Sequence, residues 1–377
     1  MKKLMKSMQI IICGGSVVFF AATVKHGDAV AAEGGSKENT RIIQMSVGRA
    51  AHQITALTNG LVLVSGGCAR RGCEIIHRSA ELFDSSKNTF SPAGNMVEPR
   101  TSHASILLKD GRILIVGGWT GQNGTMSAEI YDSKRNSFVP INAMSVARIG
   151  PVATALEDGR ILITGGEPRP GSGLNSSEVF DPDTSKFSLS GQMSVGRGAH
   201  VAVALTDGRV LVTGGHRARG EILQSAEIYD PATGEFSPTG DMTVPRHKHA
   251  GLLLPDGRVL IVGGSDARDF RGRYASTEYY EPNTGKFSPG PQMRWARHKI
   301  RHSLVLLQSG AVLVAGGAVR NELLQPGSQI FVETGEKLSG PQMFASALLL
   351  PSGKVLVVGG YDERILPSAS AWLIAKR

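Results

Sequence analysis

The sequence predicts an all-β fold, namely a seven-bladed β-propeller built of four-stranded antiparallel blades. The first observation is a Gly-Gly pair that ends an apolar run seven times in the 377 residues, at intervals of 43 to 53 residues. The second is a strand–turn–strand pattern before each pair, and the third is a short strand ending in an aromatic residue after it. A repeat of nearly constant period decides the architecture more firmly than chain length does. Seven such units favour a closed ring.

Each unit is organised around its Gly-Gly pair. The pairs are Gly66-Gly67, Gly117-Gly118, Gly165-Gly166, Gly214-Gly215, Gly263-Gly264, Gly316-Gly317 and Gly359-Gly360. Before a pair, a turn such as Asp110-Gly111 separates two apolar runs, which is a strong hairpin signal. The third strands are predicted at Glu81, Glu129, Glu178, Glu227, Glu278, Gln329 and Ser370. A turn and a fourth strand complete each unit.

The two ends of the repeat region predict how the ring closes. The last unit contains three strands, and its fourth strand is missing before the sequence ends at Arg377. The segment 40–49 (TRIIQMSVGR) resembles the fourth strand and linker at 188–197 (SLSGQMSVGR). We therefore predict that Arg41–Met45 pairs with Ser370–Ile374, because an exchanged strand removes two open sheet edges.

The first residues have the layout of a secretory signal peptide. Lys2, Lys3 and Lys6 precede an apolar stretch at 10–24, and small residues around Ala31 offer a cleavage point. We predict a signal peptide over 1–32, a linker over 33–39 and the propeller over 40–377, in a secreted or periplasmic protein. An uncleaved anchor is the alternative, although the apolar stretch is short for a membrane span. After cleavage, no stable membrane insertion is expected.

Cys68 and Cys73 lie in one predicted loop. In an oxidising compartment such a pair favours a local disulfide. A metal site would need more ligands nearby, and only His77 is available there. We predict a disulfide and no metal.

Two sets of charged residues recur at fixed positions in the units. Seventeen residues before each Gly-Gly pair stand Arg49, Arg100, Arg148, Arg197, Arg246, then Lys299 (or Arg297 if two residues bulge out) and Gln342. The third strands supply Glu81, Glu129, Glu178, Glu227, Glu278, then Gln329 and Ser370. Because arginine and glutamate disappear in the same two units, we predict structural Arg–Glu pairs in the first five blades. Ligand binding by these arginines is the alternative.

A histidine column lies fourteen residues before the Gly-Gly pairs. It reads His52, His103, Pro151, His200, His249, His302 and Ala345. Histidines at the mouth of a central channel could act as acids and bases or bind a ligand. The alternative is a hydrogen bond from each imidazole to a backbone carbonyl of the next blade, and repetition in five blades favours that structural role.

The repeat resembles a known motif. The Gly-Gly pair, the Glu-aromatic third strand and the Met-x-x-x-Arg-x-x-His segment are similar to Kelch repeats, and LLLPDGRV at 252–259 resembles their bacterial, galactose-oxidase-like form. The resemblance covers the chain from about residue 40 and implies a propeller, a fold that hosts both binding modules and enzymes.

The same resemblance bears on copper chemistry. In galactose oxidase a copper-ligating histidine of this column directly follows a ligating tyrosine. The preceding residues here are Ala51, Ser102, Ala199, Lys248 and Arg301, so we predict no copper-radical chemistry and no cofactor. The chain also resembles N-acetylneuraminate mutarotase in fold, but no set of site residues carries over.

Arginines are frequent in the loops after the Gly-Gly pairs. They are Arg70, Arg71, Arg169, Arg217, Arg219, Arg268, Arg271, Arg273, Arg320 and Arg364, and Lys299 and Arg301 stand near the channel mouth. These loops share one face of a propeller, so we predict a positive face that attracts anions. Pairing with Glu221, Asp266 and Asp269 is the alternative.

We expect a monomeric exported protein that recognises an anionic glycan or protein partner on this face. The candidate ligand-binding residues are Arg268, Arg271, Arg273, Tyr274, Trp119, Arg217, Arg219, Lys299, Arg301, His302, His249, His200 and His103. The alternative is a carbohydrate-active enzyme, mutarotase-, epimerase- or oxidase-like, that uses His249 or His302 with a carboxylate. A scaffold in an envelope assembly is a third hypothesis. Nucleic acid is not an expected partner despite the net charge of +9, because the sequence shows no basic helix or aromatic platform.

Overall fold

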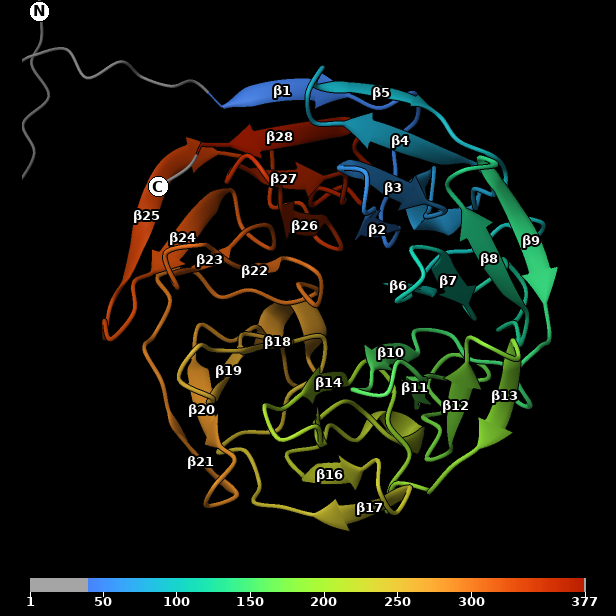
Figure 1. Ribbon diagram of the computed structural model, residues 1–377. Helices are drawn as coiled ribbons and strands as arrows, with labels where there is room; N and C mark the ends of the chain where they lie inside the picture. Colours follow the sequence, from blue (N-terminus) through green and yellow to red (C-terminus); the bar gives the residue numbers. More distant parts are fainter. Residues whose placement is uncertain (1–39, 376–377) are drawn as a thin grey trace, which may run out of the picture. The chain divides into compact units, whose positions relative to one another are not determined.

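The computed structural model describes residues 40–375, which form seven four-stranded antiparallel sheets arranged as blades around one axis (Figure 1). This confirms the predicted all-β, seven-bladed propeller. The predicted signal peptide and linker, 1–39, lie outside the described residues. Within residues 40–375 no helix has the length and hydrophobicity that crossing a membrane requires.

Blades one to six each use four consecutive strands, from the axis outwards. Blades one to three contain β2 (Gln53–Ala56), β3 (Leu61–Ser65), β4 (Ala80–Asp84) and β5 (Thr89–Pro92); β6 (Ala104–Leu107), β7 (Ile113–Val116), β8 (Ala128–Asp132) and β9 (Ser137–Ile141); β10 (Val152–Ala155), β11 (Ile161–Thr164), β12 (Ser177–Asp181) and β13 (Lys186–Leu189). Blades four to six contain β14 (Val201–Ala204), β15 (Val210–Thr213), β16 (Ala226–Asp230) and β17 (Glu235–Pro238); β18 (Ala250–Leu253), β19 (Val259–Val262), β20 (Thr277–Glu281) and β21 (Lys286–Pro289); β22 (Leu304–Leu306), β23 (Val312–Val314), β24 (Arg320–Leu324) and β25 (Phe331–Lys337). Short 3₁₀ helices in the loops are η1 (Arg71–Cys73), η2 (Ala218–Gly220) and η3 (Asp269–Gly272).

Blade seven combines both ends of the propeller. It contains β26 (Ser346–Leu349), β27 (Val355–Val358), β28 (Ser370–Ile374) and, as its outermost strand, β1 (Arg41–Gln44). Arg41 lies opposite Leu373 and Gln44 opposite Ser370, which confirms the predicted closure of the ring. The exchange pairs both edges that separate ends would leave open.

The second strand of each blade forms the core because it is covered on both sides. In β11, Ile161 and Ile163 pack with blade two, whereas Leu162 packs with Val210 and Val212 of blade four. Side chains alternate between the two faces of a strand, so a strand between two neighbouring sheets must be apolar at every position. This explains the continuous apolar runs before the Gly-Gly pairs.

The Gly-Gly pairs make room for the next blade. Gly165 has a φ of 52°, and a Cβ there would lie 2.5 Å from the carbonyl oxygen of Arg197 and 2.6 Å from Cε1 of His200. No L side chain tolerates both the close approach and the left-handed backbone. The loops after these pairs and the segments leading into the innermost strands share one side of the ring, which we call the loop face. The opposite side, with the Asp-Gly hairpin turns, is the turn face.

Blade six departs from the predicted register. Its third strand is β24, Arg320–Leu324, and not a strand at Gln329, which precedes β25. The loop after Gly316-Gly317 is therefore short, and Arg320 belongs to a strand where it pairs with Glu333 at 3.0 Å. The prediction was wrong because it assumed a loop of standard length after this Gly-Gly pair.

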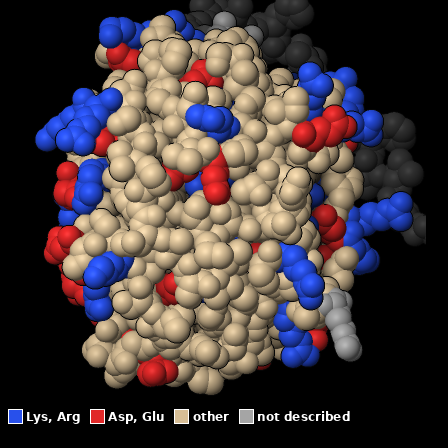
Figure 2. Space-filling model, turned by 90° about the vertical axis from the view of Figure 1, so that its right-hand side faces the viewer, with Lys and Arg blue, Asp and Glu red and all other residues tan. Residues whose placement is uncertain are grey.

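Basic side chains occur on both faces of the ring. Viewed onto its rim, the outer wall is largely uncharged, and charged groups of both signs gather towards the two edges (Figure 2). On the turn face, Arg112, Arg160, Arg209 and Arg258 each pair with an aspartate of their own hairpin turn at 2.6 Å. The number of arginines therefore does not distinguish the loop face from the turn face. What matters is whether each arginine is paired with a carboxylate.

Candidate functional site

The arginine column forms buried ion pairs inside the blades. All five predicted pairs are present, with Nη2 to Oε1 distances of 2.6 to 3.1 Å. The structure adds a sixth in blade six, Arg297 with Glu322 at 2.8 Å, where the sequence suggested Lys299 or Arg297 and Gln329. These arginines have essentially no exposed surface.

Arg148 shows why this set is structural. Its Nη1 donates to the carbonyl oxygens of Gly165 and Ser176, both at 2.9 Å, and its Nη2 donates to Glu178. The second oxygen of Glu178 accepts the N–H of Ser145 at 2.8 Å. Burial lowers the pKa of Arg148, and the carboxylate of Glu178 opposes that shift. Every N–H donor of Arg148 is therefore used within the protein, and this arginine joins strands within its blade.

Three histidines of the histidine column join neighbouring blades. Nε2 of His103 lies 2.9 Å from Oγ of Ser65, and the same distance separates His200 from Thr164. Burial lowers the pKa of both imidazoles well below 6.5, so they are neutral. The hydrogen bonds go to hydroxyl groups directly before a Gly-Gly pair, where a backbone carbonyl was predicted.

The contact between neighbouring blades at this position is apolar where the column has no histidine. Ile300 occupies the column in blade six, not His302, and it faces the segment that follows Val262. His52 is the exception, because it lies against Gly359, which follows Val358, and neither ring nitrogen has a partner among the described residues. Burial lowers the pKa of His52 to about 3, with the charge of Arg49 adding to the shift.

A ring of backbone hydrogen bonds surrounds the axis on the loop face. Its seven members directly precede the histidine column and all have a positive φ; they are Ala51, Ser102, Gly150, Ala199, Lys248, Lys299 and Phe344. Each N–H donates to the carbonyl of the member in the preceding blade at 2.8 to 3.1 Å, as from Ser102 to Ala51, in six of the seven steps. We call these residues the axial ring.

The axial ring is interrupted between blades three and four. Among residues 40–375 the N–H of Ala199 has no acceptor, and the carbonyl of Gly150 instead accepts Nη1 of Arg301 at 3.3 Å. Arg301 and His302 reach the axis because nineteen residues separate Arg297 from Gly316, two more than in the first five blades. The insertion thus places a guanidinium and an imidazole in the channel mouth.

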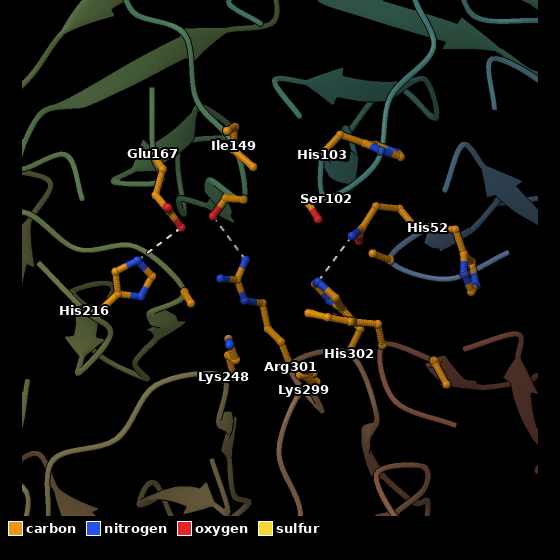
Figure 3. A pocket seen from close by; sticks show the side chains of 16 residues that line it. His52, Ser102, His103, Ile149, Glu167, His216, Lys248, Lys299, Arg301 and His302 are labelled. Carbon is orange, nitrogen blue, oxygen red and sulfur yellow. Dashed lines mark hydrogen bonds and ion pairs between the residues drawn. The ribbon is translucent and has the colours of Figure 1, made fainter. Parts of the chain in front are cut away.

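These residues line a cavity of about 160 Å³ on the axis (Figure 3). All seven members of the axial ring contribute to its wall, together with His52, Gln53, His103, Ile149, Glu167, His216, Arg301, His302 and Ala345. At about 30 Å³ per water molecule, the space holds on the order of five waters. The cavity is the candidate site, and we call it the axial pocket.

Arg301 is the distinctive group of the axial pocket. Both of its hydrogen bonds go to backbone carbonyls, those of Gly150 and Pro151, and no carboxylate in residues 40–375 forms an ion pair with it. Enclosure by the protein lowers the pKa of Arg301 to about 10, so it stays charged at neutral pH. Loss of hydration and then the charge of Arg301 lower the pKa of the neighbouring His302, although part of this residue is exposed. His302 is therefore neutral, and its Nε2 lies 3.3 Å from Nε2 of Gln53.

Two lysines of the axial pocket share one carboxylate. Lys248 Nζ lies 2.9 Å and Lys299 Nζ 3.4 Å from an oxygen of Asp269, which begins η3 at the pocket rim. Partial burial alone would raise the pKa of Asp269, but the hydrogen bond and charge of Lys248 outweigh it and lower the pKa to about 2. Each lysine thus has a carboxylate partner, although they share it, whereas Arg301 has none among the described residues.

Glu167 and His216 lie side by side in the axial pocket (Figure 3), and the imidazole of His247 follows that of His216 outside the lining. Glu167 Oε1 lies 3.3 Å from Nε2 of His216, and Nδ1 of His216 lies 3.4 Å from Nδ1 of His247. Burial raises the pKa of Glu167, but the hydrogen bond with His216 outweighs it, so Glu167 is ionised. Gly198 allows this contact, because a Cβ there would lie 2.7 Å from Nε2 of His216 and 2.8 Å from Oε1 of Glu167.

The remaining predicted residues lie outside the axial pocket. Arg268 pairs with Asp266 and Arg217 with Glu221, both at 2.5 Å. Arg273 stacks on Phe270 at 4.0 Å, and Tyr274 lies 5.3 Å from the guanidinium of the structural Arg246. Trp119 is a partly buried loop residue bridged to Thr101, and the Nε2 of His249 lies 2.9 Å from Oγ1 of Thr213. Arg271 is exposed in η3, and Arg219 belongs to η2.

Cys68 and Cys73 form a disulfide with a Cα–Cα distance of 4.8 Å. The bond closes the loop that contains η1, and Sγ of Cys68 lies 3.4 Å from Oγ1 of Thr101 in blade two. The disulfide therefore fixes the loop of blade one against its neighbour, away from the axial pocket.

Glu167 and His216 of the pocket lining, and His247 behind them, were not found from the sequence. Glu167 and His216 each directly follow a Gly-Gly pair, and His247 directly follows a column arginine. In the other blades most of these positions hold uncharged residues such as Ala50, Trp119 and Ser265, so titratable residues stand out there. Comparing the residue after each Gly-Gly pair, and the residue after each column arginine, across the units would have detected them.

The axial pocket does not provide the donors of a copper-radical site. The axial ring contains no tyrosine, and its member in blade six is Lys299, not the Arg301 assumed from the sequence. The described residues contain no group of three or more His, Cys, Asp or Glu side chains arranged to hold a metal ion. The absence of a metal and of a cofactor remains a prediction.

Comparisons with known proteins agree with the architecture. The Kelch motif matches residues 100–145 and 197–243. No curated protein matches the sequence. A solved structure described as a fungal alcohol oxidase of the AA5 family, in complex with copper, is similar to this chain with a TM-score of 0.71 and 18% identity. The match covers 89% of this chain and 76% of that one, and at this identity it shows the fold alone. Together with the repeated Gly-Gly pairs and the seven blades, these matches show a seven-bladed β-propeller in which two units match the Kelch motif.

Proposed function

We propose that the protein is a binding module that recognises an anionic partner by enclosing an acidic group in the axial pocket. The observation that carries the proposal is the guanidinium of Arg301, which lies in the pocket wall without a carboxylate partner among the described residues. Arg301 is partly exposed, but a charged side chain withdrawn from bulk water is normally paired, because the loss of hydration of an uncompensated charge costs free energy. The six arginines of the column follow this rule and Arg301 does not.

The proposal changes the site expected from the sequence and keeps the class of partner. Several loop arginines already have partners, as Arg217 and Arg268 do, so they offer an anion little net charge. Arg271 is exposed and has no carboxylate partner in the described region, so it is free to contribute at the rim. An acidic group in the pocket would gain a charge-assisted hydrogen bond, which is stronger than one between neutral groups. Recognition of an acidic glycan or an acidic protein segment is consistent with this arrangement.

Titration calorimetry with acidic oligosaccharides and acidic peptides tests the proposal. Arg301→Met removes the charge and keeps much of the side-chain volume, so affinity for the ligand that binds is expected to fall at least tenfold, which corresponds to about 1.4 kcal/mol. Arg268→Met, on the same face and paired with Asp266, is the matched control and should leave the affinity within about twofold. Equal effects of the two substitutions would reject the axial pocket as the site. Arg271→Glu measures the contribution of the rim.

A further inference from the structure

The axial pocket presents two opposite charges that are not directly paired. The guanidinium of Arg301 reaches the carbonyl of Gly150, and the neighbouring Ile149 pairs with Glu167, but Arg301 and Glu167 form neither a hydrogen bond nor an ion pair (Figure 3). Glu167 accepts from Nε2 of His216 and from the N–H of Gly171. A carboxylate has about four acceptor positions, so Glu167 retains the capacity to accept further hydrogen bonds from a ligand.

The interruption of the axial ring adds a donor beside Arg301. The N–H of Ala199 has no acceptor within residues 40–375, and Ala199 and Gly150 both line the pocket. Arg301 uses Nη1 to hold the carbonyl of Gly150, whereas its Nε and Nη2 make no hydrogen bond to the described residues. A guanidinium together with a free backbone N–H is a suitable pair of donors for a planar carboxylate.

The carboxylate of Glu167 allows the pocket to select among anions. A ligand that carries only negative charge is repelled by Glu167, and a phosphate dianion is repelled most. A ligand that also carries hydroxyl groups can donate one to Glu167, and Ser102 and Gln53 offer further polar groups elsewhere in the pocket lining. The side chains of an acidic peptide supply carboxylates without such donors. A cavity of about 160 Å³ has space for a single small residue of a ligand.

From these observations we propose that the axial pocket binds a hydroxy acid of the sugar-acid type, such as a uronic acid residue. Its carboxylate contacts Arg301 and the N–H of Ala199, and one of its hydroxyl groups donates to Glu167, whose orientation is fixed by His216 and, behind it, His247. The inference rests on the proposed function, and it selects an acidic sugar over an acidic protein segment.

Four probes and four variants test the inference. The probes are D-glucuronate, which carries carboxylate and hydroxyl groups, glutarate, which has only carboxylates, D-glucose, which has only hydroxyls, and a glutamate-rich peptide. The wild-type protein should bind glucuronate at least tenfold more tightly than each of the others. Arg301→Met should abolish the binding of both small acids. Glu167→Gln keeps the shape and removes the charge, so the ratio of glucuronate to glutarate affinity should fall about tenfold.

Gly198→Ala tests the role of Glu167 in a second way, because it leaves every charge in place. The new methyl group would displace His216 from Glu167, so the same affinity ratio should fall. Glu221→Gln, a loop carboxylate paired with Arg217, is the control and should leave the ratio unchanged. Thermal unfolding of each variant checks that the fold is intact.

The possible failures are distinguishable. If Arg301→Met leaves the binding of both acids unchanged, the proposed function itself fails. If Arg301→Met abolishes binding but Glu167→Gln and Gly198→Ala leave the affinity ratio unchanged, the anion site stands and the sugar-acid inference is wrong. Binding of glutarate or of the peptide as tightly as glucuronate by the wild-type protein also overturns the inference.

Discussion

Oγ1 of Thr213 and Nε2 of His249 lie 2.9 Å apart across the boundary between blades four and five. The same pair recurs at two other boundaries, as Ser65 with His103 and Thr164 with His200. Where the residue before the Gly-Gly pair is apolar, as at Val262, the next blade presents an apolar residue such as Ile300. The boundaries are therefore matched in polarity, with His52 as the exception.

The hydrogen bond across this boundary should contribute measurably to stability. Thr213→Val keeps the shape and leaves a buried imidazole nitrogen without a partner, which is expected to cost about 1–3 kcal/mol. Equilibrium unfolding in urea measures the loss. The double variant Thr213→Val with His249→Ile should recover much of it, because it recreates the apolar match of Val262 with Ile300. A double variant no more stable than the single one would contradict the matching of the boundaries.

The unpaired His52 predicts a stabilising substitution. Val358 directly precedes Gly359, against which the ring of His52 packs, so Val358→Thr should supply the missing hydroxyl. The gain expected from one hydrogen bond is about 0.5–1.5 kcal/mol, measured by urea unfolding. Val262→Thr is the matched control, because it places a hydroxyl against Ile300 and should be destabilising. Equal effects of the two substitutions would show that His52 is not short of a partner.

Blade six should depend on an ion pair that was not expected there. Glu322→Gln weakens the hold on the fully buried Arg297 and should cost about 3–5 kcal/mol. Glu221→Gln breaks an exposed pair with Arg217 and should cost less than about 1 kcal/mol. Denaturant unfolding of both variants gives the comparison. A small loss for Glu322→Gln would mean that Arg297 finds compensation elsewhere.

Stability should fall in mild acid because the folded protein keeps histidines neutral. The pKa of His52 is lowered to about 3, whereas an unfolded histidine titrates near 6.5. Between these pH values the unfolded chain binds more protons, so stability is full above pH 6.5 and declines as pH falls. Unfolding free energies at pH 7.5, 6.5 and 5.5 measure the decline. His52→Ile should reduce its slope by up to about 1.4 kcal/mol per pH unit, and an unchanged slope would contradict a neutral His52.

The repeat made the fold and the structural pairs predictable. Arg148 lies seventeen residues before a Gly-Gly pair and Glu178 lies in the third strand after it, as do their counterparts in four other blades, and comparing the blades predicted a physical contact. The exchange of β1 into blade seven followed from counting strands at the two ends.

The axial pocket was less predictable because it depends on departures from the repeat. The sequence already placed Arg301 near the channel mouth, but two extra residues after Arg297 move His302 out of the column, and spacing counted back from Gly316 concealed this shift. Within the described part of the chain, the N–H of Ala199 lacks an acceptor at the step of the axial ring where the carbonyl of Gly150 accepts from Arg301, a contact between residues about 150 positions apart. Local sequence patterns carry no signal for such a contact.

A structure of the protein with a bound sugar acid tests the central claim most directly. The account predicts the ligand carboxylate in the axial pocket, with its oxygens about 2.7–3.2 Å from the guanidinium of Arg301 and from the N–H of Ala199. A ligand held by the loop arginines around Arg271, or on the turn face, with Arg301 making no contact to it, would contradict the account.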